Sequence, residues 1–262
     1  MIGWINASFS VAALVGVPLV GALGGAWGWR AAFLVVGLSL LAGAAALFLF
    51  YPRAAPGVTR AGNPLVAYRY LFGRPHLVTL LFSNLLERIT YMVLMLYLPS
   101  FLILSYGLDP VSVAPALALT AVGALAGGVG GGFVADRFDR VSASATTLAL
   151  SGLCGLAAFL WPIHPAVSVA AGFGFGLLNA VGRPAFIAVL LGLVDQHRGA
   201  LNGLFALSNQ LGWALGAGIG GLLLSRVGYS GLGQFTLAFA LGAAALILLA
   251  RSAARTETRG AA

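Results

Sequence analysis

The sequence predicts an all-α polytopic membrane protein with eight transmembrane helices, and composition and hydropathy carry that prediction. Of the 262 residues, 60% are hydrophobic and 8% are charged, and the mean hydropathy is +1.00, far above that of a soluble domain. Apolar runs of about 20 residues recur along the chain, and each is long enough to cross a hydrocarbon core about 30 Å thick. A β-barrel is excluded, because its strands alternate polar and apolar residues.

The spans are separated by breaks that stop helices for identifiable reasons. Trp27–Arg30 predicts a tight turn with aromatic side chains suited to the lipid headgroup region. Gly107–Pro110 ends one helix and begins the next with proline in its first turn. We expect the eight spans at residues 5–27, 30–51, 76–104, 111–135, 141–161, 166–194, 200–225 and 231–251.

The longest polar segment, residues 52–75, contains four arginines, four prolines and three glycines. Such a composition is typical of a linker between compact units. It predicts a boundary between two helices in residues 1–51 and six helices in residues 76–262.

The arginines predict the orientation of the chain, because cytoplasmic loops of membrane proteins are enriched in basic residues. All fourteen basic residues are arginines. With both termini in the cytoplasm, two arginines of the loops and termini lie outside, Arg30 and Arg226, and ten lie inside: Arg53, Arg60, Arg69, Arg74, Arg137, Arg140, Arg198, Arg251, Arg255 and Arg259. The net charge of +8 is therefore attributed to arginines in cytoplasmic loops, and nucleic-acid binding is not expected.

The rest of the composition bears on the organism of origin and on whether the protein binds a metal or acts as an enzyme. Arginine without lysine, together with abundant alanine and glycine, is typical of a GC-rich bacterial genome, so we expect the bacterial inner membrane. One cysteine, Cys154, and three histidines near helix ends do not form a set of metal ligands, so no metal or cofactor is expected. Ser39 lies in a Gly-Leu-Ser sequence similar to the nucleophile site of rhomboid proteases, but there is no His-Glu-x-x-His motif, and an enzyme is not expected.

An internal repeat indicates a duplicated bundle. Residues 6–25 and 202–221 align at an offset of 202 − 6 = 196, and residues 43–47 recur as 242–246. The matching pairs include Asn6/Asn202, Phe9/Phe205 and Gly16/Gly212. A period near 200 residues fits the duplicated bundles of secondary transporters. The chain then holds one complete repeat and the tail of another.

The loop between spans 111–135 and 141–161 carries a motif built from Gly132, Asp136, Arg137 and Arg140. A glycine four residues before an aspartate lets two helix ends approach, and we expect Asp136 to cap the following turn while the arginines reach lipid phosphates.

This loop resembles the signature Gly-x-x-x-Asp-Arg-x-Gly-Arg of the major facilitator superfamily, with Asp139 in place of the usual glycine and Val141 in place of a usual basic residue. The run Gly24-Gly25, Gly28-Trp29-Arg30 and Phe33 is similar to the junction of helices five and six in that superfamily. The resemblance implies that the chain contains helices five to twelve of a twelve-helix plan. Residues 1–51 would be the last two helices of the N-terminal bundle, 52–75 the cytoplasmic linker, and 76–262 the C-terminal six-helix bundle.

The resemblance implies a secondary active transporter that moves a small solute across the bilayer by alternating access. Export is the favoured direction, import stays open, and protons are the candidate coupling ion. Helices one to four would be missing, so we expect no transport by this chain alone. The alternative is a non-transporting membrane subunit that associates with another helical chain.

Polar residues at membrane depth are the candidate site, because a charge there costs roughly 2.5–3.5 kcal/mol and normally faces a cavity or a partner. Glu87 and Arg88 lie midway along span 76–104, and helix geometry places them about 100° apart, so we expect them not to pair with each other. Other candidates lie one turn from Glu87 or on span 166–194: Asn84, Tyr91, Asn179 and Arg183.

Helices seven and ten of the superfamily line its central cavity, and the resemblance therefore implies that Glu87 and Arg183 face each other or the cargo. A purely structural network between helices is the competing hypothesis. Weaker candidates are Asn209, Gln210 and Trp213.

Overall fold

The computed structural model describes residues 16–50, 64–160, 164–194 and 196–260, and every regular element within them is an α-helix. The predicted all-α fold class is thus confirmed. The chain divides into two compact units, Met1–Ala61 and Gly62–Ala262. Several residues used above lie outside the described ones: Asn6, Phe9, Arg53 and Arg60.

In the first unit, α2 (Val17–Trp27) and α3 (Trp29–Phe50) are joined at Gly28. The backbone of Gly28 has φ +81°, which L side chains rarely adopt, and its N–H donates to the carbonyl of Gly24 over 3.0 Å. The tight turn predicted at Trp27–Arg30 is therefore confirmed. Residues 5–15 of the first predicted span are outside the described part of the chain.

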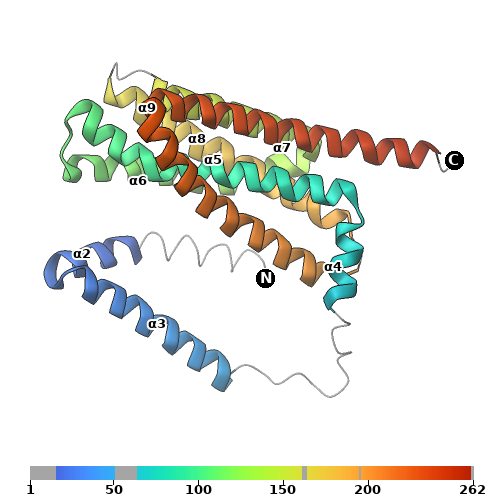
Figure 1. Cartoon of the computed structure of the whole chain (residues 1–262), viewed down its shortest axis with the longest axis horizontal. Coiled ribbons are helices and arrows are strands. Elements are labelled where there is room, and N and C mark those ends of the chain that lie inside the picture. Colours follow the sequence, from blue (N-terminus) through green and yellow to red (C-terminus); the bar gives the residue numbers. More distant parts are fainter. Residues whose placement is uncertain (1–15, 51–63, 161–163, 195, 261–262) are drawn as a thin grey trace. The chain divides into compact units, whose positions relative to one another are not determined.

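The described residues of the second unit form six helices: α4 (Pro64–Phe72), α5 (Pro75–Tyr106), α6 (Pro110–Arg137), α7 (Arg140–Leu160), α8 (Pro165–Gly192) and α9 (Arg198–Gly260). The bounds of α5 to α8 agree with four predicted spans to within a few residues, α9 holds two predicted spans, and α4 lies in the segment predicted as a linker. Gly228 (φ 69°, ψ −168°) breaks the helical path of α9. Figure 1 shows α9 folding back there into two arms, 198–227 and 229–260.

Six described helices are long and apolar enough to cross a membrane, and the last of these, Arg198–Arg251, has 54 residues. A straight helix of that length would measure roughly 80 Å, more than twice the hydrocarbon thickness. Because α9 folds back at Gly228, this segment crosses the membrane twice. The chain is a multi-pass membrane protein.

The segment predicted as a linker contains α4, and its end is fixed to the helices that follow. Leu71 is fully buried. Arg74 donates from Nη1 to the carbonyl of Leu193 at 2.6 Å and from Nη2 to the hydroxyl of Tyr70. The latter part of the polar segment thus packs on the end of α8 and belongs to the second unit.

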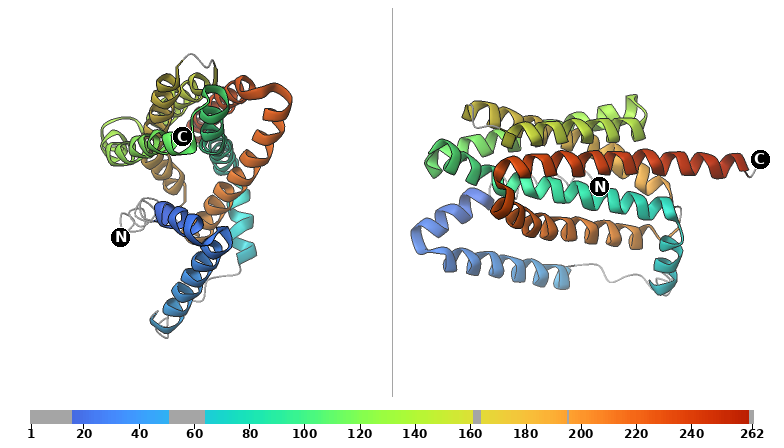
Figure 2. Two further views of the ribbon diagram at one scale, coloured as in Figure 1. Left: turned by 90° about the vertical axis from the view of Figure 1, so that its left-hand side faces the viewer. Right: turned by 45° about the horizontal axis from the view of Figure 1, so that its top comes forward.

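Glycines set the distances between helices in this unit. The most extensive helix contacts in this unit are α5 with α9, α6 with α8, and α7 with both α8 and α9 (Figure 2). A Cβ on Gly123 of α6 would lie 2.5 Å from the carbonyl oxygen of Phe173, and one on Gly131 would lie 2.7 Å from that of Val181. Only glycine permits this approach of two backbones, so glycines bring α6 and α8 into close contact.

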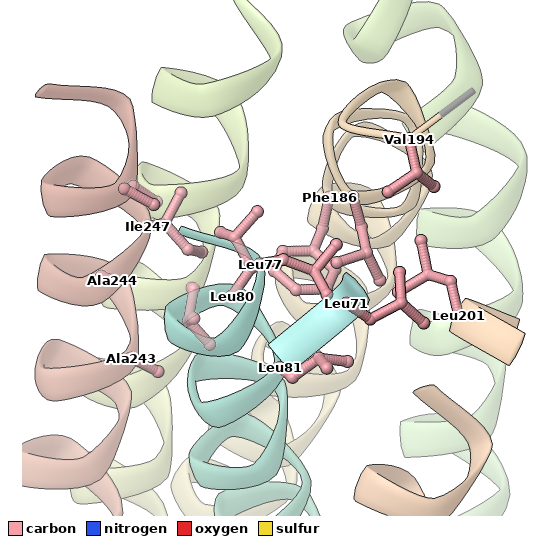
Figure 3. Packing of buried hydrophobic residues seen from close by; sticks show 14 of the residues in the cluster. Leu71, Leu77, Leu80, Leu81, Phe186, Val194, Leu201, Ala243, Ala244 and Ile247 are labelled. Carbon is pink, nitrogen blue, oxygen red and sulfur yellow. The ribbon is translucent and has the colours of Figure 1, made fainter. Parts of the chain in front are cut away.

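Two apolar clusters fill the second unit at different levels. The first, drawn in Figure 3, gathers Leu77, Leu80, Phe186, Leu190 and Ile247, among others. The second includes Leu94, Leu98, Phe101, Phe159 and Phe175. Residues 83–91 of α5 lie between the two clusters. The candidate residues therefore occupy a level of their own within the bundle.

Candidate functional site

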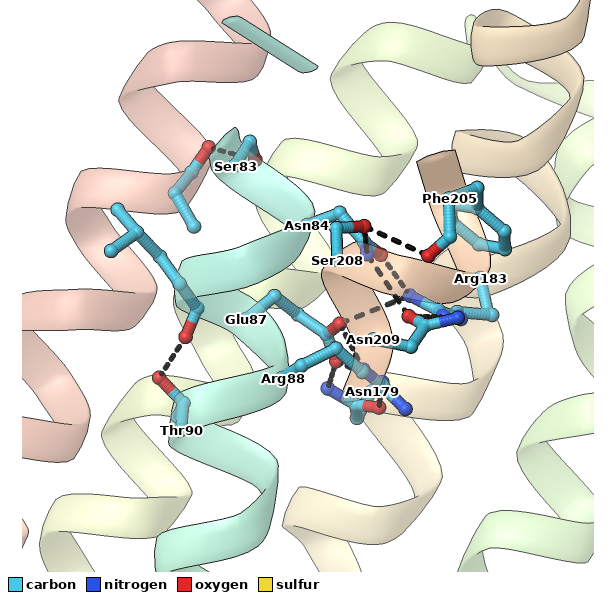
Figure 4. Close-up of polar contacts among 12 residues, drawn as sticks. Ser83, Asn84, Glu87, Arg88, Thr90, Asn179, Arg183, Phe205, Ser208 and Asn209 are labelled. Carbon is cyan, nitrogen blue, oxygen red and sulfur yellow. Dashed lines mark hydrogen bonds and ion pairs between the residues drawn. The ribbon is translucent and has the colours of Figure 1, made fainter. Parts of the chain in front are cut away.

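The site is a layer of polar side chains at the middle of α5, α8 and the first arm of α9 (Figure 4). We call it the polar layer; its members are Asn84, Glu87, Arg88, Asn179, Arg183, Ser208 and Asn209. Glu87 is 7% exposed and Arg88 is 8% exposed. At this depth each charge needs partners within the protein.

Glu87 and Arg88 form an ion pair, and the expectation that neighbours on a helix would not pair is wrong. Nε of Arg88 donates to Oε2 of Glu87 at 2.5 Å, and Nη2 donates to Oε1. The angle of about 100° separates only the Cβ directions. The arginine stem is long enough to fold back around the helix, and its planar fork matches both carboxylate oxygens.

Arg183 joins α8 to α5 and α9. Its Nη1 lies 3.0 Å from Oε2 of Glu87 and donates to Oδ1 of Asn84 at 2.7 Å. Its Nη2 donates to Oδ1 of Asn209 at 2.9 Å. The guanidinium carbon also lies 5.0 Å from the ring centre of Phe205, within the range of a cation–π contact. Glu87 and Arg183 therefore face each other, as the resemblance implied.

Amide side chains satisfy the rest of the network. Asn179 donates to Oε1 of Glu87 at 2.6 Å and accepts from Arg88 at 3.1 Å. Asn84 donates to the hydroxyl of Ser208 at 2.7 Å and to Oδ1 of Asn209 at 2.9 Å. An amide can donate and accept at once, which suits it to link charges of opposite sign.

Other candidates lie beside the network or outside it. The ring of Tyr91 lies under the guanidinium of Arg88, with 4.7 Å between the Cζ atom and the ring centre. Gln210 and Trp213 are exposed and take no part. Ser208 is a member of the polar layer that the sequence did not predict, because a serine in an apolar helix gives no signal until the rotation of that helix is known.

The close approach of α9 to α5 depends on Gly212. A Cβ at this position would contact Cβ of Arg88 and lie 2.9 Å from the carbonyl oxygen of Leu85. Gly212 follows Ser208 by one turn, so the same helix face carries the hydrogen-bonding side chains and the small residue that brings them to α5.

A cavity of about 30 Å³ lies beside the polar layer, between α5, α7, α8 and the second arm of α9. Polar groups from Ser144, Thr147 and Asn179 line it together with Glu87. One water needs roughly 10–15 Å³ and two to four polar partners, so the cavity has room for about two waters. It is too small for an organic solute.

A family model described as Major Facilitator Superfamily matches residues 1–181 and 80–262, which together cover the chain. The chain belongs to the major facilitator superfamily. Its architecture is similar to that of a solved structure described as a bacterial homolog to the human lysosomal transporter Spinster, in an inward-facing and unoccupied conformation, with 20% sequence identity and a TM-score of 0.59.

That likeness supports the fold alone, and it covers 93% of this chain and 64% of the Spinster homolog. The chain therefore spans about two thirds of the length of that structure. No curated protein matches the sequence.

The loop that resembles the superfamily signature lies between α6 and α7, and the aspartate that caps α7 is Asp139 rather than Asp136. Oδ2 of Asp139 accepts from the backbone N–H of Ser142 at 2.9 Å and pairs with Arg251 at 2.8 Å. Asp136 is exposed in the last turn of α6. The prediction failed because α6 extends to Arg137, so the residue that follows its end, not the motif aspartate, meets the free N–H groups of α7.

The other members of this loop have simpler surroundings. Arg137 lies over the ring of Phe133, with 4.2 Å between the Cζ atom and the ring centre. Arg140 donates to the carbonyl of Ala135 at 3.3 Å. A Cβ on Gly132 would meet nothing within 4 Å, so the expectation that this glycine lets two helix ends approach is wrong. In α3, Ser39 donates to the carbonyl of Val35 at 2.8 Å, an ordinary contact of a serine with its own helix.

Proposed function

We propose that this chain is the larger part of a secondary active transporter that exports a small solute by alternating access, with protons as the coupling ion. The observation that carries the proposal is Glu87, a carboxylate at mid-depth that joins arginines from two helices. Its protonation would remove one charge from a shared network and so change how α5 and α8 are held together.

We assign each part of the chain a role from the twelve-helix architecture of the superfamily. Residues 1–51 would close the N-terminal bundle, and 76–262 would form the C-terminal bundle with Asn84, Glu87, Tyr91 and Arg183 toward the solute. The loop around Asp136 and Arg137 would gate on the cytoplasmic side, with both chain ends in the cytoplasm of a bacterium. Because the chain spans 64% of the Spinster homolog, we propose that transport requires four further helices.

The test compares Glu87→Gln with Asp109→Asn in the intact transporter. Asp109 is an exposed residue at the start of α6, where it accepts from Ser112, so its substitution removes the same charge outside the bundle. Mass spectrometry measures the ratio of internal to external concentration for all detectable solutes at two external pH values. We expect at least one solute to be depleted from the cells in a pH-dependent way by the parent protein and by Asp109→Asn.

Glu87→Gln should abolish the pH dependence while the protein is still inserted and folded. If depletion keeps its pH dependence in Glu87→Gln, Glu87 has a structural role only. If the 262-residue chain alone moves the solute in vesicles, the requirement for further helices is wrong.

A further inference from the structure

The charges of the polar layer do not balance, and we propose that Arg183 binds an anionic group of the transported solute, a carboxylate or a phosphate. The inference rests on the proposed transport function. Arg88 and Arg183 contribute two guanidinium groups, and Glu87 contributes one carboxylate, so the layer has a net charge of 2 − 1 = +1 when all three are ionised. Charges with so little access to water are normally paired, so the excess positive charge favours one further anion.

Glu87 is committed mainly to Arg88. Arg88 contacts both carboxylate oxygens, and its side chain is 9% exposed. It is held further by Asn179 and by the ring of Tyr91. Arg183 contacts a single oxygen of the same carboxylate, at 3.0 Å. Arg183 is therefore the residue whose charge is left over.

The other partners of Arg183 orient it without neutralising it. Asn84 and Asn209 offer neutral amide oxygens at 2.7 Å and 2.9 Å, and Phe205 offers the face of its ring. These contacts fix the plane of the guanidinium. They leave its charge in place.

Arg183 is also the accessible arginine of the layer. Its side chain is 22% exposed, and its Nε donates to no described residue. The Nε and Nη2 atoms form one edge of the guanidinium, and a carboxylate or phosphate can accept from such an edge with two oxygens at once. The cavity of about 30 Å³ holds no organic solute, so the anion would approach the exposed side of Arg183.

Calorimetric titration of the purified full chain in a neutral detergent tests the proposal with probes of equal chain length: hexanoate, hexyl phosphate and hexylammonium. We expect at least one anion to bind and hexylammonium not to bind. Arg183→Gln should weaken the anion about tenfold or more, as expected when a charge-assisted hydrogen bond is lost. Arg183→Lys keeps the charge but loses the fork, so its affinity should be intermediate.

Arg226→Gln is the matched control, because it removes the same charge at an exposed position, and it should leave the affinity unchanged. Unaltered anion binding in Arg183→Gln, equal binding of hexylammonium, or the absence of saturable anion binding would each overturn the proposal. Thermal unfolding of each variant identifies those that are not folded. If Arg183→Gln is not folded, the affinity of Arg183→Lys is compared with that of the parent protein instead.

Two further arms identify the source of the anion and separate this inference from the transport function. In phosphatidylcholine nanodiscs, added phosphatidic acid should weaken the probe if a lipid headgroup occupies the site and should have no effect if a free solute does. If Arg183→Gln still exports a neutral or cationic solute, the anion site is wrong and transport stands. If the chain binds anions through Arg183 but the intact protein moves no solute, transport is wrong and the site stands.

Discussion

The polar layer and the α6–α7 loop both pair an acid with an arginine from another helix, but their surroundings differ. In the layer, the side chains of Glu87 and Arg183 are 9% and 22% exposed. In the loop, those of Asp139 and Arg251 are 49% and 28% exposed. Breaking a buried pair leaves a charge without solvent and costs about 3–5 kcal/mol, whereas an exposed pair contributes about 0–1 kcal/mol. Substitutions that break the ion pair should therefore destabilise the protein strongly in the polar layer and only slightly in the α6–α7 loop.

The largest effect is expected for Glu87→Ala, which leaves two guanidinium groups in the layer without a carboxylate. We expect the free energy of unfolding in detergent to fall by about 3–5 kcal/mol. The double variant Glu87→Ala with Arg88→Met removes the pair together and should recover part of that loss. A double variant no more stable than Glu87→Ala would show that the charge imbalance is not the cause.

A steric change should have the next largest effect, at Gly212. Gly212→Val would force α9 away from Leu85 and Arg88, and overpacking of this kind costs about 1–3 kcal/mol. The matched control is Gly218→Val on the same arm, where a Cβ would meet nothing within 4 Å. Equal thermal stability of the two variants would mean that the contact at Gly212 does not set the distance between α5 and α9.

Features that depend on a local segment of sequence were predicted, whereas features that depend on contacts between helices were predicted only in part. Hydropathy predicted the spans well, because membrane insertion is a property of each local segment. Glu87 and Arg183 were predicted because charged residues are rare in apolar helices. Asn209 was a weaker candidate and Ser208 was missed, because their contacts depend on the rotation of α9 about its axis, which single-residue polarity does not encode.

Two predictions failed for reasons of side-chain reach and helix length. Pairing of Glu87 with Arg88 is decided by the long arginine stem rather than by the angle between neighbouring Cβ atoms. The capping role passed from Asp136 to Asp139 because α6 ends two residues before Asp139, at Arg137. Motif spacing locates such a loop but does not fix the residue at which a helix ends.

The smallest effect is expected at Asp139, where substitution can separate two contributions. Asp139→Asn removes the charge that pairs with Arg251 but keeps a side chain that caps helices well, so stability should fall by about 0–1 kcal/mol. Asp139→Ala also removes the hydrogen bond to the N–H of Ser142, and loss of a cap costs about 0.5–2 kcal/mol more. Thermal unfolding of both variants in low and high salt distinguishes the terms, because salt screens the ion pair and not the cap. If Asp139→Asn were as damaging as Glu87→Ala, exposure would not explain the difference between the two regions.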